Sequence, residues 1–155
     1  MEYSFDQLLH KAASYCSIAE HCTTEVDEKL QKWGASEVER NSIIDSLIEK
    51  DFINENRYAA AFVRDKFRFN KWGKMKISYA LKMKRIAGAA VSEALSQIDD
   101  DEYQALLVDV LKSKLKSLKY GDEYERNGKL IRYAQSKGFE YEQIDCALRQ
   151  LASVD

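Results

Sequence analysis

The 155-residue sequence contains no proline and only six glycines. Both residues are common in the tight reversals of strand-rich folds, so their scarcity favours uninterrupted helices joined by short turns. The sequence also lacks any apolar run near the roughly 18 residues that a membrane span needs, and its start, Met1-Glu2-Tyr3-Ser4, does not resemble a signal peptide. We therefore expect a helical cytoplasmic protein without a membrane span.

Cysteine and histidine are scarce as well. Three cysteines without paired spacing argue against a disulfide framework and favour a reducing compartment. His10, Cys16, His21 and Cys22 are residue types found in metal sites, but they lack the C-x-x-C or H-x-x-x-H spacing of zinc sites. No metal or other cofactor is predicted. Cys16 shares a helical stripe with Leu8 and is expected to be a small buried residue.

The sequence also lacks the groupings that catalysis requires, such as a phosphate-binding loop, a nucleophile elbow or a metal-binding pair. The acidic run at residues 99–102 has neither the glycine nor the terminal glutamate of a calcium loop. Acidic side chains are favourable at the start of a helix, where they face its dipole, and the run fits that position. We predict that the protein is not an enzyme.

What the sequence does contain is helical periodicity with clear starts and stops. Polar caps are paired with a side chain three residues later at three places: Ser4 with Gln7, Ser36 with Glu39, and Asp122 with Glu125. Glycines mark the expected stops at Gly34, Gly73, Gly88, Gly121 and Gly138. Between these marks, apolar residues recur at helical steps. We predict nine helices, near residues 4–20, 23–33, 36–50, 54–70, 74–86, 89–98, 101–119, 122–137 and 140–153.

These helices fall into three groups of three, at residues 1–53, 54–98 and 99–155. A period near 50 residues predicts stacked helical repeats. The segment from Leu30 to Gly34 is similar to the segment that ends at Gly138, although the spacing after each glycine differs. Coincidence between amphipathic helices is the alternative. The predicted fold class is all-α, with three tandem three-helix repeats.

Charge is concentrated in the middle group. Residues 57–86 carry a net charge of +9, with Asp65 as the only acid, so the rest of the chain carries −11. A locally cationic unit in an acidic protein is suited to binding phosphate groups or an acidic protein surface. The ten basic residues are Arg57, Arg64, Lys66, Arg68, Lys71, Lys74, Lys76, Lys82, Lys84 and Arg85.

Helical spacing indicates how these residues are presented. Arg57, Arg64 and Arg68 lie within about 40° of one another on a helix, away from the apolar side of the same helix. The following helix has a second apolar stripe, which is either inter-repeat core or a partner surface, with the core favoured. Its members are Met75, Tyr79, Met83 and Ile86.

Aromatic residues alternate with the basic ones. Phe67, Phe69 and Trp72 would allow bases to stack beside phosphate contacts, although aromatic residues at such spacing are more often part of a core. Base stacking is therefore a minor hypothesis.

The middle of the chain resembles the signature unit of the RecX family. The similarity is carried by Phe52-Ile53-Asn54-Glu55-Asn56-Arg57-Tyr58-Ala59, Phe62-Val63-Arg64-Asp65-Lys66, Trp72-Gly73-Lys74-Met75-Lys76-Ile77 and Leu81-Lys82-Met83-Lys84-Arg85-Ile86. The segment from Cys22 to Gly34 is similar to the first repeat of that family. The third group matches in pattern only.

The resemblance implies three tandem three-helix repeats in an elongated, curved body. It also implies a regulator that binds the filament of the recombinase RecA, binds single- and double-stranded DNA through phosphate contacts, and inhibits recombinase and ATPase activity. Roles in DNA repair, homologous recombination and the SOS response follow from it, and a monomer is expected. The rival interpretation is a helical-repeat scaffold whose acidic protein partner is not RecA.

Overall fold

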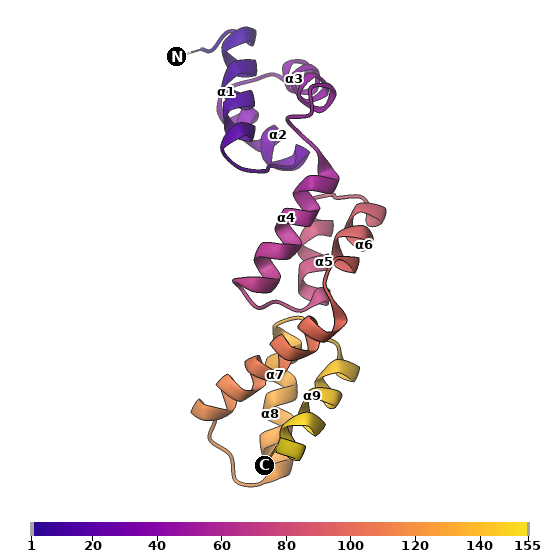
Figure 1. Cartoon of the computed structure of the whole chain (residues 1–155). Coiled ribbons are helices and arrows are strands. Elements are labelled where there is room, and N and C mark those ends of the chain that lie inside the picture. Colours follow the sequence, from indigo (N-terminus) through magenta and orange to yellow (C-terminus); the bar gives the residue numbers. More distant parts are fainter. Residues whose placement is uncertain (1, 155) are drawn as a thin grey trace. The chain divides into compact units, whose positions relative to one another are not determined.

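The computed structural model describes residues 2–154, and within that range every regular element is a helix (Figure 1). The predicted all-α class is confirmed, and each predicted helix is present with ends within three residues of those expected. The nine helices found among these residues are α1 (Phe5–Ile18), α2 (Thr23–Lys32), α3 (Glu37–Glu49), α4 (Glu55–Arg68), α5 (Lys74–Met83), α6 (Gly88–Ser96), α7 (Asp100–Ser117), α8 (Glu123–Ser136) and α9 (Tyr141–Val154). No helix between residues 2 and 154 is both long and apolar enough to span a membrane.

The predicted caps begin their helices. The Ser4 hydroxyl accepts a hydrogen bond from the Gln7 backbone, and the Gln7 side chain accepts one from the Ser4 backbone. Ser36 and Glu39 make the same reciprocal pair at α3. Each pair satisfies two backbone N–H groups that the first turn of a helix leaves without partners.

The helices end at the expected glycines only in part. Gly34 and Gly138 follow α2 and α8 with φ values of +89° and +98°, the left-handed conformation that favours glycine. Gly88 was expected to end a helix, but it begins α6 instead. The left-handed residue after α5 is Arg85, at φ +63°, and Lys71 has φ +57° after α4. Two of the predicted binding residues thus occupy a conformation that is costly for a side chain with a Cβ.

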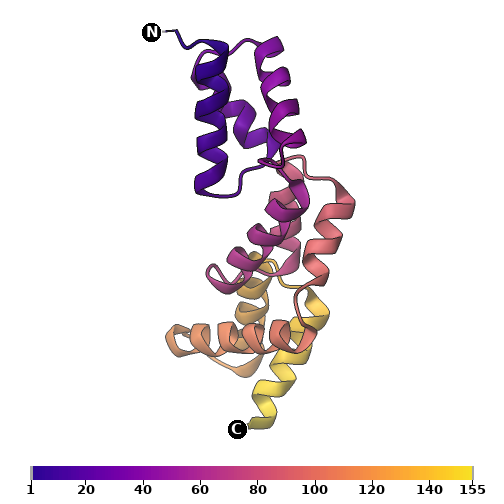
Figure 2. The same ribbon diagram turned by 45° about the horizontal axis from the view of Figure 1, so that its top comes forward.

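The described chain forms two compact units. Unit 1 comprises the residues up to 61 together with 81–93. In it, α1, α2 and α3 pack against one another, as both ribbon views show (Figures 1 and 2). Leu8 of α1, Leu30 of α2 and Ile43 and Leu47 of α3 are almost fully buried between them. Cys16 is buried in the same core, as its spacing predicted.

Unit 2 comprises residues 62–80 and the chain from 94 onward, and α7 packs against both α8 and α9. Its buried aromatic residues form a row, with ring centroids 5.9 Å apart for Phe67 and Tyr103 and 5.3 Å apart for Tyr103 and Phe139. The buried Tyr103 hydroxyl hydrogen-bonds to Glu140 and accepts a 2.9 Å hydrogen bond from the Lys74 backbone. The start of α5 is therefore fixed against α7 and α9.

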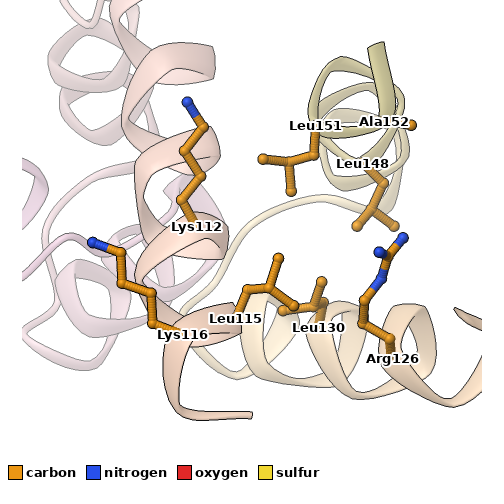
Figure 3. A pocket seen from close by; sticks show the side chains of 8 residues that line it. All are labelled: Lys112, Leu115, Lys116, Arg126, Leu130, Leu148, Leu151 and Ala152. Carbon is orange, nitrogen blue, oxygen red and sulfur yellow. The ribbon is translucent and has the colours of Figure 1, made fainter. Parts of the chain in front are cut away.

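A hollow of about 340 Å³ remains open between α7, α8 and α9 (Figure 3). Leucine side chains from the three helices point toward one another across it, and three basic side chains lie around them. Its lining residues are Lys112, Leu115, Lys116, Arg126, Leu130, Leu148, Leu151 and Ala152.

Two glycines bring the α4–α5 connection into contact with the α8–α9 connection inside unit 2. The Gly73 amide donates a 2.7 Å hydrogen bond to the Lys137 carbonyl, and the Met75 amide donates a 3.0 Å bond to the Gly138 carbonyl. A Cβ at Gly73 would overlap the backbone of Gly138 and Phe139, and a Cβ at Gly138 would overlap Lys76. Only glycine allows these two backbones to approach so closely.

This contact predicts a steric cost at Gly73. Gly73→Ala should lower the free energy of unfolding by about 1–3 kcal/mol, because the new methyl group meets backbone atoms that cannot move aside. Gly88→Ala is the matched control, since a Cβ there meets no atom within 4 Å and the position is helical. It should be neutral or stabilising by roughly 0.5 kcal/mol. Urea unfolding of the two variants makes the comparison, and equal stabilities would contradict the close-packing argument.

Candidate nucleic-acid interface

The ten predicted binding residues divide between the two units. Unit 1 contains Arg57, Lys82, Lys84 and Arg85. Unit 2 contains Arg64, Lys66, Arg68, Lys71, Lys74 and Lys76. The environments of the two sets differ, because carboxylates of unit 1 neutralise part of the first set and aromatic rings or other cations surround much of the second.

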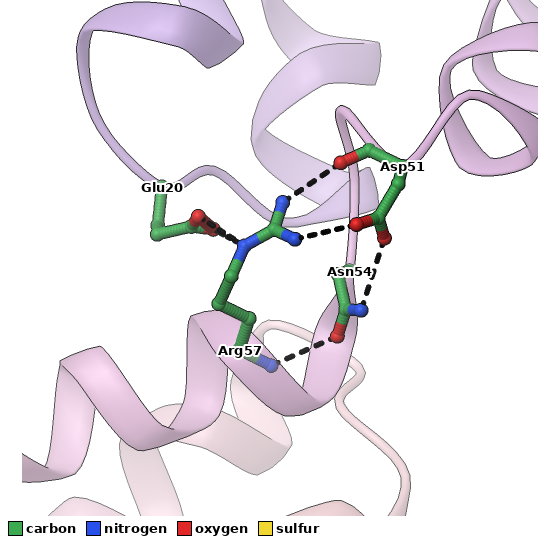
Figure 4. Close-up of polar contacts among 4 residues, drawn as sticks. All are labelled: Glu20, Asp51, Asn54 and Arg57. Carbon is green, nitrogen blue, oxygen red and sulfur yellow. Dashed lines mark hydrogen bonds and ion pairs between the residues drawn. The ribbon is translucent and has the colours of Figure 1, made fainter.

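Arg57 is bound within unit 1 (Figure 4). Its guanidinium group pairs with the Glu20 carboxylate, lies 3.0 Å from Asp51 Oδ2 and donates a 2.9 Å hydrogen bond to the Asp51 carbonyl. Asn54 donates to Asp51 and accepts a hydrogen bond from the Arg57 backbone. Glu20 and then Asp51 raise the pKa of Arg57, while Asn54 and Arg57 lower the pKa of Asp51. Arg57 thus links three segments of the fold, and two carboxylates already neutralise its positive charge.

Lys84 is held in a similar way. Its ammonium nitrogen lies 3.1 Å from Glu25 Oε2, and its carbonyl accepts a 2.8 Å hydrogen bond from the Thr24 hydroxyl. Burial acts to raise the pKa of Glu25, but hydrogen bonds from Lys84, the Cys22 backbone and His21 outweigh burial and leave this pKa below its usual value. Lys84 therefore ties the end of α5 to α2. Lys82 and Arg85, the other predicted binding residues of unit 1, are exposed.

In unit 2, lysines lie against aromatic rings. Lys66 Nζ is 4.9 Å and Lys76 Nζ is 4.6 Å from the centroid of the Trp72 ring, and Lys74 Nζ is 4.7 Å from the centroid of Tyr103. Cation–π contacts position an ammonium group without cancelling its charge. Lys74 is also 4.0 Å from the exposed Asp100 carboxylate. These lysines are held in place by rings that carry no opposing charge.

The two arginines of unit 2 among the predicted binding residues are exposed one turn apart on α4. Arg64 lies 3.5 Å from the neighbouring Asp65 carboxylate, and Arg68 lies 3.8 Å from Glu102. More than half of each arginine side chain is exposed, at 57% and 59%. Long ion pairs at such exposed positions contribute little to stability, so a phosphate group could replace the carboxylate at small cost.

The aromatic residues proposed for base stacking have different roles. Phe67 is 3% exposed and stacks on Tyr103 in the core, so the hypothesis is wrong for this residue. Trp72 is partly buried between Lys66 and Lys76. Phe69, by contrast, is 79% exposed.

The four residues of the second apolar stripe also differ in their exposure. Ile86 is buried, as the favoured core interpretation requires. Met75, Tyr79 and Met83 are exposed by 61%, 66% and 65%, so that interpretation is wrong for these three. An exposed series of large apolar side chains is a feature of interaction surfaces.

Lys137 is a cation of this surface that the sequence did not predict. Its ammonium group donates a 2.9 Å hydrogen bond to the Asn70 carbonyl. Burial, followed by the nearby ammonium groups of Lys76 and Lys71, lowers the pKa of Lys137. We call Lys71, Lys76 and Lys137 the lysine triad. Repulsion of the Lys137 charge by its two neighbours favours binding of an anion.

The sequence signal for Lys137 was its neighbour Gly138. In the two similar segments of the sequence, Lys137-Gly138 corresponds to Trp33-Gly34, at equivalent positions of two predicted repeats. What places Lys137 beside the basic residues is the contact of Gly138 with Gly73, which joins positions 65 residues apart and has no local sequence signature.

A metal-binding grouping is not found in the region that the structure covers. Over residues 2–154, no three His, Cys, Asp or Glu side chains are placed to hold a metal ion. Burial raises the pKa of the Cys16 thiol to about 11, and His21 stacks on Tyr15 with ring centroids 3.7 Å apart. In the acidic run, Asp99 caps α7 by accepting a hydrogen bond from the Glu102 backbone.

Comparison with known families gives a direct match for most of the chain. Residues 54–95 match the second three-helix domain of RecX, and residues 100–148 match its third three-helix domain. The chain belongs to the RecX family. The boundaries drawn after residues 53 and 98 stay a prediction.

Individual relatives agree with this assignment. The regulatory protein RecX of Clostridium botulinum (strain Alaska E43 / Type E3) is 31% identical over 144 residues, which covers 90% of this chain and 67% of the relative. Regulatory protein RecX of Clostridium perfringens (strain SM101 / Type A) is 30% identical over 131 residues, which covers 83% of this chain and 61% of the relative. The chain therefore spans about three-fifths of the length of this second RecX protein.

The fold has also been seen in a crystal structure. RecX from Lactobacillus salivarius superposes with a TM-score of 0.85 at 24% identity, and the match covers 96% of each chain. This likeness supports the helical fold and says nothing about binding.

The Arg57 network predicts a difference between two exposed arginines of the same helix. Arg57→Ala should lower the thermal unfolding midpoint by roughly 2–4 °C, because it leaves Glu20 and Asp51 without their shared cation. Arg64→Ala, which loses only a 3.5 Å contact with Asp65, should leave the midpoint unchanged. Differential scanning calorimetry measures both midpoints. Equal midpoints would mean that the network adds no stability.

Proposed function

We propose that this RecX-family chain is a regulator that binds RecA nucleoprotein filaments and DNA and lowers recombinase and ATPase activity. The observation that carries the proposal is the cationic surface of unit 2, where Arg64 and Arg68 are exposed and the contact of Gly138 with Lys76 brings Lys137 near other basic residues. The matched relatives are named as regulatory proteins. Under this proposal the chain acts in DNA repair by binding and not by catalysis, as a cytoplasmic monomer.

Charge distribution supports binding to a filament in preference to free DNA. The segment 57–86 carries +9 and the rest of the chain −11, so only part of the molecule attracts phosphate groups. A filament offers both DNA phosphates and protein side chains. Several weak contacts with one filament raise the effective concentration of the others, whereas free DNA offers only the phosphate contacts.

Backbone conformation supports a binding role for two of the basic residues. Lys71 and Arg85 have positive φ values, where glycine or asparagine would cost less. A basic side chain at each of these positions is consistent with selection for its charge, since strained backbone is often found at functional sites.

DNA recognition by this surface should not depend on sequence. The available groups are ammonium and guanidinium groups, which contact phosphates, and the proposed surface has no helix carrying Asn or Gln pairs that could read base edges. The other candidate function is a scaffold for an acidic protein other than RecA, which the same cations would also attract.

The first test is the salt dependence of DNA binding. Replacing Arg64, Arg68 and Lys71 together by Ala should reduce the slope of log affinity against log salt concentration by roughly 2–3, because each lost phosphate contact removes about 0.7–0.9. The matched control replaces Lys112, Lys116 and Lys119, which removes the same charge from unit 2 elsewhere. Fluorescence anisotropy with a labelled oligonucleotide gives both slopes. Equal slopes for the two triple variants would mean that the DNA-binding charge is spread over the protein and is not concentrated on the proposed surface.

The second test concerns RecA. Adding this chain to RecA filaments on single-stranded DNA should reduce ATP hydrolysis even when DNA is in excess, because surplus DNA would absorb a protein that only competes for DNA. Charge reversal at Arg64 and Arg68 should abolish the inhibition and leave the circular dichroism spectrum unchanged, since both side chains are exposed. The RecA used must come from the same organism. Unchanged hydrolysis with the wild-type chain would favour the scaffold function instead.

A further inference from the structure

We propose that a groove beside the lysine triad holds an unstacked base of single-stranded DNA, so that this surface prefers single strands to duplex. The inference rests on the proposed function and extends it, because it names the strand form and the residues that select it. It starts from the exposed part of the second apolar stripe.

The groove lies within unit 2 and has a volume of about 470 Å³. Met75 and Tyr79 of α5 line it, as do Gly138 and Phe139 of the α8–α9 connection and Tyr141 at the start of α9. The Gly73–Gly138 contact holds the two helices in this relation. The groove is thus a built feature of the fold.

Its aromatic side chains are available to a ligand. Tyr79 is 66% exposed and Tyr141 is 58% exposed, although both line the same groove. Large apolar side chains cost free energy when they remain in water, and a planar ligand that covers the rings would recover part of that cost. Every base has such a planar face, so tyrosine rings bind single-stranded nucleic acid with little dependence on sequence.

The cations beside the groove select an anionic ligand. Lys76 lines the groove itself, and Lys137 directly precedes the lining residue Gly138. Lys76 and Lys71 are close enough to Lys137 to lower its pKa. A strand with one base in the groove would carry its phosphates past these ammonium groups. No acidic side chain lines the groove, so the lining offers nothing that repels a phosphate.

The combination of stacking and phosphate contacts requires a single strand. In a duplex, each base is covered by its neighbours and paired to its partner, so the tyrosine rings could reach a base only after unpairing it. The cations, in contrast, contact phosphates of either form. The groove should therefore add affinity for single strands on top of an electrostatic term that both forms share.

An acidic amphipathic segment of a protein is the other chemistry that such a groove could attract. The observations favour DNA, because two exposed tyrosine rings line the groove together with Lys76. A protein ligand is kept as an outcome of the experiment.

The test compares two forms of DNA with one double variant, Tyr79→Ala with Tyr141→Ala. Affinity for a labelled 30-nucleotide oligo-dT should fall by roughly 5- to 150-fold for each stacked base lost, while affinity for a 30-base-pair duplex should stay within about twofold of wild type. Alanine is a good helix former and both side chains are exposed, so the fold should be kept. Circular dichroism checks this.

Two control variants sharpen the comparison. Tyr79→Phe with Tyr141→Phe keeps the rings and should retain wild-type preference for the single strand. Tyr120→Ala removes another exposed tyrosine of unit 2, in the α7–α8 connection, and should change neither affinity.

The remaining outcomes overturn the inference in distinct ways. Equal losses on both DNA forms, or no loss on either, would mean that the tyrosines do not stack on a base. Loss of RecA inhibition with both DNA affinities intact would assign the groove to a protein segment. If the wild-type chain binds neither DNA form, the base-holding groove is overturned together with the DNA-binding part of the proposed function, whereas the other outcomes leave that function standing.

Discussion

The close contact of two backbones at Gly73 and Gly138 is the constraint on which the candidate site depends. It joins the α4–α5 and α8–α9 connections through two backbone hydrogen bonds and leaves no room for a Cβ on either glycine. Because of it, Lys137 lies near Lys71 and Lys76, and the groove between α5 and α9 has two walls. The Tyr103 hydroxyl, which bonds both to the Lys74 backbone and to Glu140, secures the same junction from the core side.

The fold could be predicted from the sequence because its determinants are local. Capping pairs such as Ser36 with Glu39 span three residues, and the apolar period of each helix is visible within a dozen. The error at Gly88 has a local cause as well. A glycine between two helical patterns fits the end of one or the start of the next, and here Arg85 took the left-handed position that was assigned to glycine.

The candidate site was predictable only as a region. Composition identified the cationic segment, but which cations stay available depends on partners far away in sequence. Arg57 is neutralised by Glu20, 37 residues earlier, and Lys84 by Glu25, 59 residues earlier. Phe67 and Tyr79 belong to the same basic segment, yet one is core and the other exposed. Helical period assigns a residue to a face and does not say what covers that face.

The two units therefore use the same residue types for different purposes. In unit 1, carboxylates take up Arg57 and Lys84 and convert their charge into links between helices. In unit 2, the lysine triad brings like charges together, which costs stability unless an anion is bound. A fold selected only for stability would replace one member of that triad by a neutral residue. An anionic ligand would offset this repulsion, and that is the physical ground on which we propose the binding surface in unit 2.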